Sequence, residues 1–288
     1  MGTIISGKAV SATIRAQIRE RALQLREDYG VQPGLAVILV GDDPASQIYV
    51  RNKQRACDEL GFHAFEYKLN ENYTQEQLLD LIGVLNKDNK VHGILVQLPL
   101  PDHIDERTVL NAIDPNKDVD AFHPVNVGRI VLNDYEFLPC TPAGIMELID
   151  STGVEIRGKH AVVVGRSNIV GKPMSMLLLH RDATVTMCHS KTQNLAEICA
   201  QADILVSAVG HAHFIQPDMV KEGAMVIDVG MNHDENGKLC GDVEFDKVEP
   251  KTSYITPVPG GVGPMTITML MKNTLHAAER TVQNKLGN

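Results

Sequence analysis

The chain has 288 residues and a formal net charge of −9, with 43% hydrophobic and 22% charged residues. This ordinary globular composition, over roughly two domain lengths, excludes a largely disordered or fibrous protein. The acidic balance argues against non-specific nucleic-acid binding, because a phosphate backbone is itself anionic. No apolar run approaches the roughly 18 residues that span a bilayer, so we expect no membrane association.

The five cysteines are scattered and include no CxxC pair. This pattern argues against a disulfide scaffold or a zinc site and favours a reducing compartment. Because the opening segment, residues 1–20, has no apolar signal core, we expect a cytoplasmic protein. His211 and His213 form a pair with no third ligand at a fixed spacing, so we expect a loop there and no metal site.

Short apolar runs, most of them nearly unbroken, alternate with longer amphipathic stretches along the chain. Such runs are typical of strands buried on both faces of a parallel sheet, and the alternation predicts an α/β fold. Strands are expected at residues 34–41, 63–69, 92–101, 159–165, 183–188, 202–210 and 223–230. Helices are expected at residues 6–28, 44–60, 74–88, 105–112, 172–181, 193–200, 217–221 and 265–286.

A boundary between two domains is expected within residues 114–141, which show no clear helical period. The next helix should begin with Thr141 as its N-cap and Pro142 in its first turn, and should end before Gly153. The sequence therefore predicts two domains that meet near this helix.

A short turn joins the predicted strand 159–165 to the helix that follows it. Gly165, Ser167 and Gly171 have the spacing G-x-S-x-x-x-G instead of the usual G-x-G-x-x-G. A helix N-terminus at the end of a buried strand offers free N–H groups and a partial positive charge to phosphate. The flanking strand and helix favour a nucleotide site, and the alternative is a turn with no ligand.

The residues after the next strand indicate which nucleotide this turn would bind. An NAD site places an acidic residue there, but His189, Ser190 and Lys191 follow this strand, and no acid occurs before Glu197. A carboxylate would repel a 2′-phosphate, whereas Arg166, Ser190 and Lys191 would attract it. The sequence therefore favours NADP over NAD, although Lys191 alone could be an ordinary surface lysine.

The predicted helix 44–60 carries polar side chains on one face. Ser46, Tyr49 and Lys53 are spaced i, i+3 and i+7, so they share that face. An ammonium held near a phenol and apolar surface becomes a usable acid or base, and the alternative is a surface lysine packed on tyrosine. Gln97 stands inside an apolar run near a strand end, where α/β proteins place ligands and where a buried amide needs partners.

Two further segments carry candidate binding groups. Of Asp118 and Asp120, one is expected to face a ligand, whereas Asp114 before a proline is expected to form a turn. The loop 256–264 is rich in glycine and proline but lacks the Lys-Ser/Thr of a P-loop. Its glycines would let the backbone approach a flat ligand, and a purely structural turn is the alternative.

Six of these segments recur together in a known family. They are YVRNK (49–53), VQLPLP (96–101), DVDAFHPVNVGR (118–129), VVVGRSNIVGKP (162–173), IDVGMN (227–232) and ITPVPGGVGPMT (255–266). In this order, along essentially the whole chain, they resemble the bifunctional methylenetetrahydrofolate dehydrogenase/cyclohydrolase family. The resemblance implies a homodimer of two-domain subunits with the active site in the cleft between the domains. The implied domains are a folate-binding catalytic α/β domain (1–139 and 266–288) and a Rossmann-like NADP domain (140–265).

The resemblance also implies the ligand contacts. Tetrahydrofolate derivatives would contact Tyr49, Lys53, Gln97, Asp120, Pro259, Gly260 and Gly261. NADP would contact Thr141, Gly165, Arg166, Ser167, Ser190 and Met231, of which Met231 replaces the family's usual isoleucine.

The implied chemistry has two steps. Hydride passes from 5,10-methylenetetrahydrofolate to NADP, and water then opens the methenyl product to 10-formyltetrahydrofolate. Lys53 would be the catalytic lysine tuned by Gln97, with Tyr49 over the folate and Asp120 on the pterin ring.

Two other functions stay open at this point. An NADP-dependent dehydrogenase of the shikimate dehydrogenase kind would leave the loop 256–264 unexplained. A catalytically inactive nucleotide sensor is less favoured, because Lys53 and Gln97 are both present.

Overall fold

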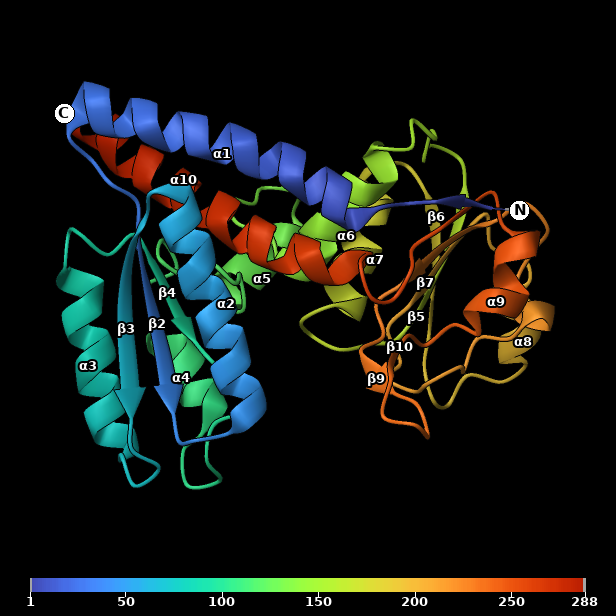
Figure 1. Cartoon of the computed structure of the whole chain (residues 1–288), viewed down its shortest axis with the longest axis horizontal. Helices are drawn as coiled ribbons and strands as arrows, with labels where there is room; N and C mark the ends of the chain where they lie inside the picture. The colour runs from blue at the N-terminus through green and yellow to red at the C-terminus, as the bar shows by residue number, and fades with distance from the viewer. Residues whose placement is uncertain (1, 287–288) are drawn as a thin grey trace. The chain divides into compact units, whose positions relative to one another are not determined.

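A computed structural model describes residues 2–286 of the chain. The chain forms two compact units, which are described separately (Figure 1). Unit 1 comprises Met1–Ala12 and Pro139–Thr266, and unit 2 comprises Thr13–Leu138 and Ile267–Asn288. The helices and strands follow the predicted alternation, so the α/β fold is confirmed.

Unit 2 is built on a three-stranded parallel sheet with the order β3 (His63–Leu69), β2 (Gly34–Val40) and β4 (Gly93–Val96). Every residue of β2 and β4 is buried. The side chains of Ala36, Ile38 and Val40 on one face of β2 belong to the same core cluster as the apolar residues of the neighbouring helices. Both faces of this sheet are therefore covered, as the unbroken apolar runs predict.

Helices α2 (Pro44–Leu60), α3 (Gln75–Lys87) and α4 (Glu106–Ala112) connect the strands of unit 2 or follow them. Their ends are set by the expected local chemistry: the side chain of Asp43 accepts from the backbone N–H of Ser46 at 2.7 Å, at the N-terminus of α2. At the other end of α2, Gly61 adopts a left-handed conformation with φ 73°.

Two long helices, α1 (Gly7–Tyr29) and α10 (Val262–Leu286), run side by side in unit 2 (Figure 1). The guanidinium of Arg21 donates to the carboxylate of Glu279, with Nε 3.0 Å from Oε1. Nearer the N-terminal ends, Arg15 Nε donates to Thr268 Oγ1 at 3.1 Å. These contacts tie the last helix of the chain to the first at two points along their length.

Helix α5 (Pro124–Val131) lies in the segment for which no helical period was expected. Its apolar residues do not mark its buried face consistently, because Val125 and Val131 are exposed while Asn126 is buried. The side chain of His123 caps it by accepting from the N–H of Val125 at 3.1 Å. Apolar periodicity could not reveal a helix of this kind.

Unit 1 is built on a six-stranded parallel sheet (Figure 1). In sheet order, the strands are β1 (Thr3–Ile4), β11 (Tyr254–Ile255), β8 (Met225–Asp228), β7 (Ile204–Ser207), β5 (His160–Val164) and β6 (Thr184–Cys188). The chain passes from β5 to β6 on one side and then to β7 on the other. The strand order thus reverses at β5, and such a switch point is where open α/β sheets bind ligands.

Unit 1 also contains the helices α6 (Cys140–Asp150), α7 (Gly171–His180), α8 (Leu195–Cys199) and α9 (Phe245–Val248). It further contains the 3₁₀ helices η1 (Pro217–Met219) and η2 (Glu249–Lys251) and a hairpin of β9 (Asn232–His233) and β10 (Leu239–Cys240). The prediction of Thr141 as an N-cap is wrong, since Pro139 holds that position and α6 begins at Cys140. Pro142 remains in the first turn, where its missing N–H costs no helical hydrogen bond.

The first residues of the chain belong to unit 1 through β1, whose Thr3 pairs with Tyr254. The division implied by the family resemblance groups residues 1–12 with residues 13–139, and that assignment of roles stays a prediction. Among the described residues, no helix is long and apolar enough to cross a membrane.

Candidate functional site

The turn between β5 and α7 is shaped by two glycines. Gly165 has φ 136°, and a Cβ there would lie 2.5 Å from the carbonyl oxygen of Ala208. A Cβ on Gly171 would overlap the carbonyl oxygen of Gly165. The first turn of α7 therefore lies directly against the end of β5, which only glycine permits at these two positions.

Ser167 orders the same turn through its side chain. Its Oγ accepts from the N–H of Val170 at 3.1 Å and from that of Gly171 at 3.3 Å. Helix α7 thus begins at the carboxyl edge of the sheet, beside the point where the strand order reverses. A helix N-terminus in this place is suited to a phosphate group.

The ends of β5 and β6 bring the predicted phosphate ligands to one edge of the sheet. The two strands are parallel, with Val164 beside Cys188, and the N–H of Gly165 donates to the carbonyl of Cys188 at 2.9 Å. Arg166 and Ser190 follow these strand ends, and both are exposed. A cationic and a hydroxyl group that follow neighbouring strand ends suit a phosphate ester.

A pocket of about 300 Å³ in unit 1 gathers another group of predicted residues. The predicted residues that line it are Thr141, Met231, Pro259, Gly260 and Gly261. Gly165, Arg166, Ser167 and Ser190 are not among its lining residues, although they belong to the same unit.

The glycine-rich loop forms one wall of this pocket. Gly260 has φ 104°, and a Cβ on Gly261 would lie 2.5 Å from the carbonyl oxygen of Pro257. The backbone is therefore the surface that the loop presents, as expected for contact with a flat ligand. The loop is shorter than the predicted range 256–264, because α10 begins at Val262 and not at residue 265.

Lys8 and Thr266 are among the lining residues of this pocket that sequence reasoning did not single out. Thr266 Oγ1 lies 3.0 Å from Thr141 Oγ1, which joins the start of α6 to α10. Lys8 reaches the pocket because its backbone N–H donates to the carbonyl of Gly260 at 3.2 Å. Neither residue has a distinctive spacing in the sequence. Lys8 comes near this loop through the pairing of β1 with β11.

In unit 2, Lys53 and Gln97 form a direct hydrogen bond. Lys53 Nζ donates to Gln97 Oε1 at 2.8 Å, and both residues are half-buried. Gln97 Nε2 donates to the carbonyl of Leu98 at 2.7 Å, and the backbone N–H of Gln97 donates to Ile38 at 2.8 Å. These two bonds orient the amide so that its oxygen faces the lysine.

Tyr49 lies one turn before Lys53 on α2, with 38% of its surface exposed. The third member of the predicted face, Ser46, is buried near the start of the helix. The three side chains thus run from the buried start of α2 towards the half-buried ammonium, and Tyr49 offers an accessible ring next to it.

The three aspartates of residues 114–120 have different environments. Asp118 is buried, and its Oδ2 accepts from the N–H of His123 and from Asn126 Nδ2, each at 2.8 Å. Burial raises the pKa of Asp118, which its hydrogen bonds partly offset. Asp120 is only half-buried, so of the pair it is the carboxylate nearer to solvent.

Asp114 is a turn former, as predicted. Its Oδ1 accepts from the backbone N–H of Asn116 at 2.8 Å and from Asn116 Nδ2 at 3.0 Å. Asp118 is thereby assigned to local structure together with Asp114, and Asp120 is left as the candidate for a ligand.

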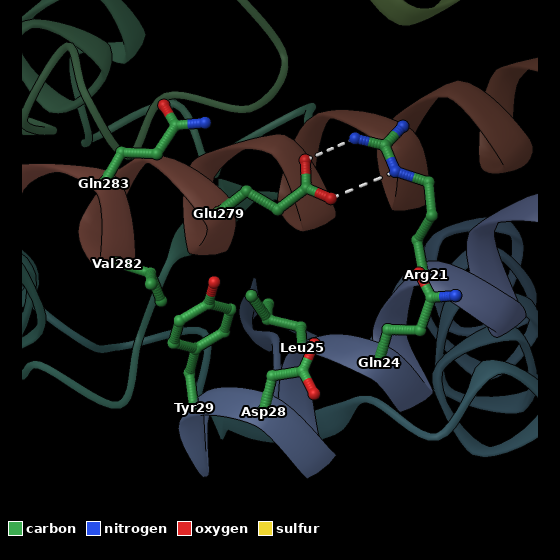
Figure 2. A pocket seen from close by; sticks show the side chains of 8 residues that line it. All are labelled: Arg21, Gln24, Leu25, Asp28, Tyr29, Glu279, Val282 and Gln283. Carbon is green, nitrogen blue, oxygen red and sulfur yellow. Dashed lines mark hydrogen bonds and ion pairs between the residues drawn. The ribbon is translucent and has the colours of Figure 1, made fainter. Parts of the chain in front are cut away.

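Figure 2 shows a second pocket of about 300 Å³, between α1 and α10 in unit 2. Its charged side chains include Arg21 and Glu279, which form an ion pair with each other. None of the predicted site residues lines this pocket. It is therefore a groove between two helices and carries no part of the candidate site.

Models of two protein-family domains match the chain. The catalytic domain of tetrahydrofolate dehydrogenase/cyclohydrolase matches residues 5–120, and the NAD(P)-binding domain of the same family matches residues 139–282. The chain belongs to the tetrahydrofolate dehydrogenase/cyclohydrolase family.

Relatives of the same length support this membership. The "Bifunctional protein FolD" of Acetivibrio thermocellus is 59% identical over 282 residues, covering 98% of this chain and 99% of that protein. The protein of the same name from Streptococcus pneumoniae serotype 4 is 59% identical over 285 residues, covering 99% and 100%.

Solved structures of the family are also similar. A FolD methylenetetrahydrofolate dehydrogenase/cyclohydrolase from Campylobacter jejuni is 52% identical, with a TM-score of 0.95 and coverage of 98% and 100%. The Trypanosoma brucei FolD, complexed with NADP and an inhibitor, is 43% identical, with a TM-score of 0.93 and coverage of 98% and 99%. The shikimate dehydrogenase alternative is not favoured, because both family domains match the chain.

Proposed function

We propose that this protein is a bifunctional folate enzyme. It oxidises 5,10-methylenetetrahydrofolate to 5,10-methenyltetrahydrofolate with NADP and then hydrolyses that product to 10-formyltetrahydrofolate. The observation that carries the proposal is the hydrogen bond between Lys53 and Gln97 in a chain matched by both family domains.

The groups at the carboxyl edge of the unit 1 sheet fit NADP. The close approach of Gly171 to Gly165 brings the N-terminus of α7 to the end of β5, where its backbone N–H groups would bind a diphosphate. Arg166 and Ser190 would hold the 2′-phosphate, Ser167 would order the phosphate turn, and Thr141 and Met231 would border the nicotinamide. When bound, NADP supplies the acceptor for hydride, and the protein supplies binding and orientation.

The hydrolytic step requires proton transfers that Lys53 is placed to make. Water adds to the methenyl carbon and gives up one proton, which leaves a neutral carbinolamine with a hydroxyl on that carbon. The bond from the carbon to N5 then breaks as N5 gains a proton, and the hydroxyl loses its proton as the formyl C=O forms, so that one proton is released overall. The Lys53 amine would take the first proton and return one, held in position by the amide oxygen of Gln97.

Further residues would bind the folate. Asp120, half-buried and accessible, would accept hydrogen bonds from the donors of the pterin ring. The exposed ring of Tyr49 would pack over the folate. The backbone of Pro259, Gly260 and Gly261 would complete the folate contacts.

The domain roles, assembly and location belong to the same proposal. Residues 1–139 and 266–288 would serve folate binding and catalysis, and residues 140–265 would bind NADP. The five cysteines of the chain are free and buried, which fits a reducing, cytoplasmic location. A homodimer is proposed from the family resemblance, and sedimentation equilibrium of the purified protein tests it.

A single spectroscopic experiment tests the two activities. Purified protein is mixed with 5,10-methylenetetrahydrofolate and NADP, and the absorbance of NADPH and of the methenyl product is followed. We expect both to rise and the methenyl signal then to decay. NADP reduction with shikimate, or NADP binding without folate turnover, would refute the proposal.

A further inference from the structure

Two buried carboxylates support the wall of the unit 1 pocket on which Met231 lies. Asp228 ends strand β8 and is 2% exposed, and Asp242 follows β10 and is fully buried. Residues 228–231 and Leu239 form part of the pocket lining. Sequence reasoning gave neither aspartate a role, although Asp228 lies within the segment IDVGMN (227–232).

The carboxylate of Asp228 binds three backbone N–H groups. Oδ1 accepts from Gly230 and from Asp242, each at 2.9 Å, and Oδ2 accepts from Val243 at 3.0 Å. The turn after β8 is thereby tied to the segment that follows β10. Three donors on one ionised carboxylate are charge-assisted bonds, which are stronger than bonds between neutral groups.

The carboxylate of Asp242 binds four donors from three other segments. Oδ2 accepts from the N–H of Val209 at 2.8 Å and from Ser207 Oγ at 3.1 Å. Oδ1 accepts from the N–H of His211 at 3.1 Å and from Asn232 Nδ2 at 2.9 Å. This one side chain therefore joins the end of β7, the loop after it and the first residue of β9.

Two glycines make the interlock possible. A Cβ on Gly241 would overlap the carboxylate of Asp228, and a Cβ on Gly230 would overlap the carboxylate and backbone of Asp242. The Asp228 carboxylate thus packs on Gly241, which precedes Asp242. The Asp242 carboxylate packs on Gly230, whose N–H donates to Asp228. A side chain at either glycine would therefore displace one of the two carboxylates.

Met231 lies between the two anchored positions. The preceding residue, Gly230, is held by Asp228, and the following residue, Asn232, is held by Asp242. We propose that Asp242, acting through Asn232, is a positioning residue that fixes the backbone at Met231 for NADP. The proposal rests on the function proposed above, in which Met231 contacts the cofactor.

The variant Asn232→Ala removes the link to Met231 and leaves the other three donors on Asp242. We expect the KM for NADP and the Kd from an NADPH fluorescence titration to rise about tenfold, the size of one hydrogen bond to a charged group. Hydrolysis of added 5,10-methenyltetrahydrofolate uses no nucleotide, so its rate should stay unchanged. A purely structural role would not separate the two activities.

Asp242→Asn tests the aspartate itself. An amide offers one oxygen where four donors now bind, so we expect a larger rise in the KM for NADP than in Asn232→Ala. The matched control is Asp234→Asn in the same hairpin, where Oδ1 accepts from the N–H groups of Asn236 at 2.9 Å and Lys238 at 2.8 Å. Asp234 does not line the pocket, and its variant should retain the wild-type KM.

The outcomes separate this proposal from the proposed function. An unchanged affinity for NADPH in Asn232→Ala, or an equal loss of both activities, would overturn the positioning role. An effect of Asp234→Asn as large as that of Asn232→Ala would do the same. If the wild type lacked either activity, the proposed function would fail, and the NADPH titrations would still decide whether the network positions the nucleotide contact.

Discussion

The ammonium of Lys53 and the amide oxygen of Gln97 lie 2.8 Å apart, although 44 residues separate them in the chain. They meet because β2 and β4 are parallel neighbours, so α2 after β2 and the turn after β4 share one edge of the sheet. An amide oxygen orients an ammonium without placing a negative charge beside it, which suits the proposed acid–base role of Lys53. A carboxylate in this position would hold the lysine protonated.

Replacing Lys53 should separate the two proposed activities. Lys53→Ala removes the amine that donates to Gln97, and we expect the cyclohydrolase rate to fall by about 10²- to 10⁴-fold, the usual contribution of an acid or base. Lys53→Arg should fail as well, because a guanidinium does not release its proton at neutral pH. The decay of methenyltetrahydrofolate absorbance measures the rate, and wild-type hydrolysis in Lys53→Ala would refute the role.

Gln97→Leu serves as the companion variant, since it keeps the amine and removes its oriented acceptor. We expect a smaller loss than in Lys53→Ala, together with a changed pH profile for hydrolysis. Equal losses in both variants would show that the lysine works only when it is oriented.

Arg166→Ala should weaken NADP much more than NAD. The exposed guanidinium follows β5 at the edge that Ser190 shares, and only NADP carries the 2′-phosphate that it would bind. Loss of a hydrogen bond to a charged group costs about 1.5–3 kcal/mol, or roughly a 10- to 100-fold higher KM for NADP. Steady-state kinetics with each nucleotide measure the ratio, and equal losses would remove the argument for the phosphate.

Gly171→Ala should damage both stability and nucleotide binding. The new methyl group would overlap the carbonyl oxygen of Gly165 and force α7 away from the strand end. Overpacking of this kind costs about 1–3 kcal/mol in the free energy of unfolding, and we expect a higher KM for NADP as well. Thermal unfolding and NADPH titration measure the two effects.

Gly83→Ala in α3 is the matched control, because a Cβ there meets nothing within 4 Å. Alanine should raise the free energy of unfolding by about 0.5–1 kcal/mol and leave NADP affinity unchanged. If Gly171→Ala and Gly83→Ala had the same effects on the free energy of unfolding and on NADP affinity, the close approach of α7 to β5 would not be required for either.

The extent of prediction from sequence differs between parts of the molecule. Strands such as β2 and β5 were recognisable because both of their faces are buried and their runs are unbroken. Helix α5 was not, because its exposed valines and buried Asn126 do not follow the expected pattern. Strand β1 has two residues, and its place depends on pairing with β11 about 250 positions away, which no local pattern encodes.

The candidate site shows the same division. The turn at Gly165 and Gly171 is readable because it combines a strand, glycines and a helix start within a few residues. The contribution of Lys8 to the pocket, and of Asp242 to the wall beside Met231, depends on chain segments that meet only in the folded sheet. Sequence reasoning identifies site residues that lie within a few positions of one another. It misses residues that reach the site from distant segments of the chain.

The buried carboxylate of Asp228 should make stability depend on pH in a defined direction. Burial raises its pKa from 3.8 to about 6, which outweighs the lowering by its three N–H donors. Because the folded state holds this proton more tightly than the unfolded state, the stability present below pH 4 is lost as the pH rises to about 6. Above that range Asp228 is ionised in both states and its contribution is constant.

Comparison of the wild type with Asp228→Asn isolates this contribution. The free energy of unfolding of the wild type, relative to that of the variant, should fall by about 1 kcal/mol between pH 5 and pH 7.5, since one pKa unit corresponds to about 1.4 kcal/mol. Urea unfolding of both proteins at the two pH values measures the difference. A difference that stays constant, or that moves in favour of the wild type as the pH rises, would show that the folded protein does not raise the pKa of Asp228.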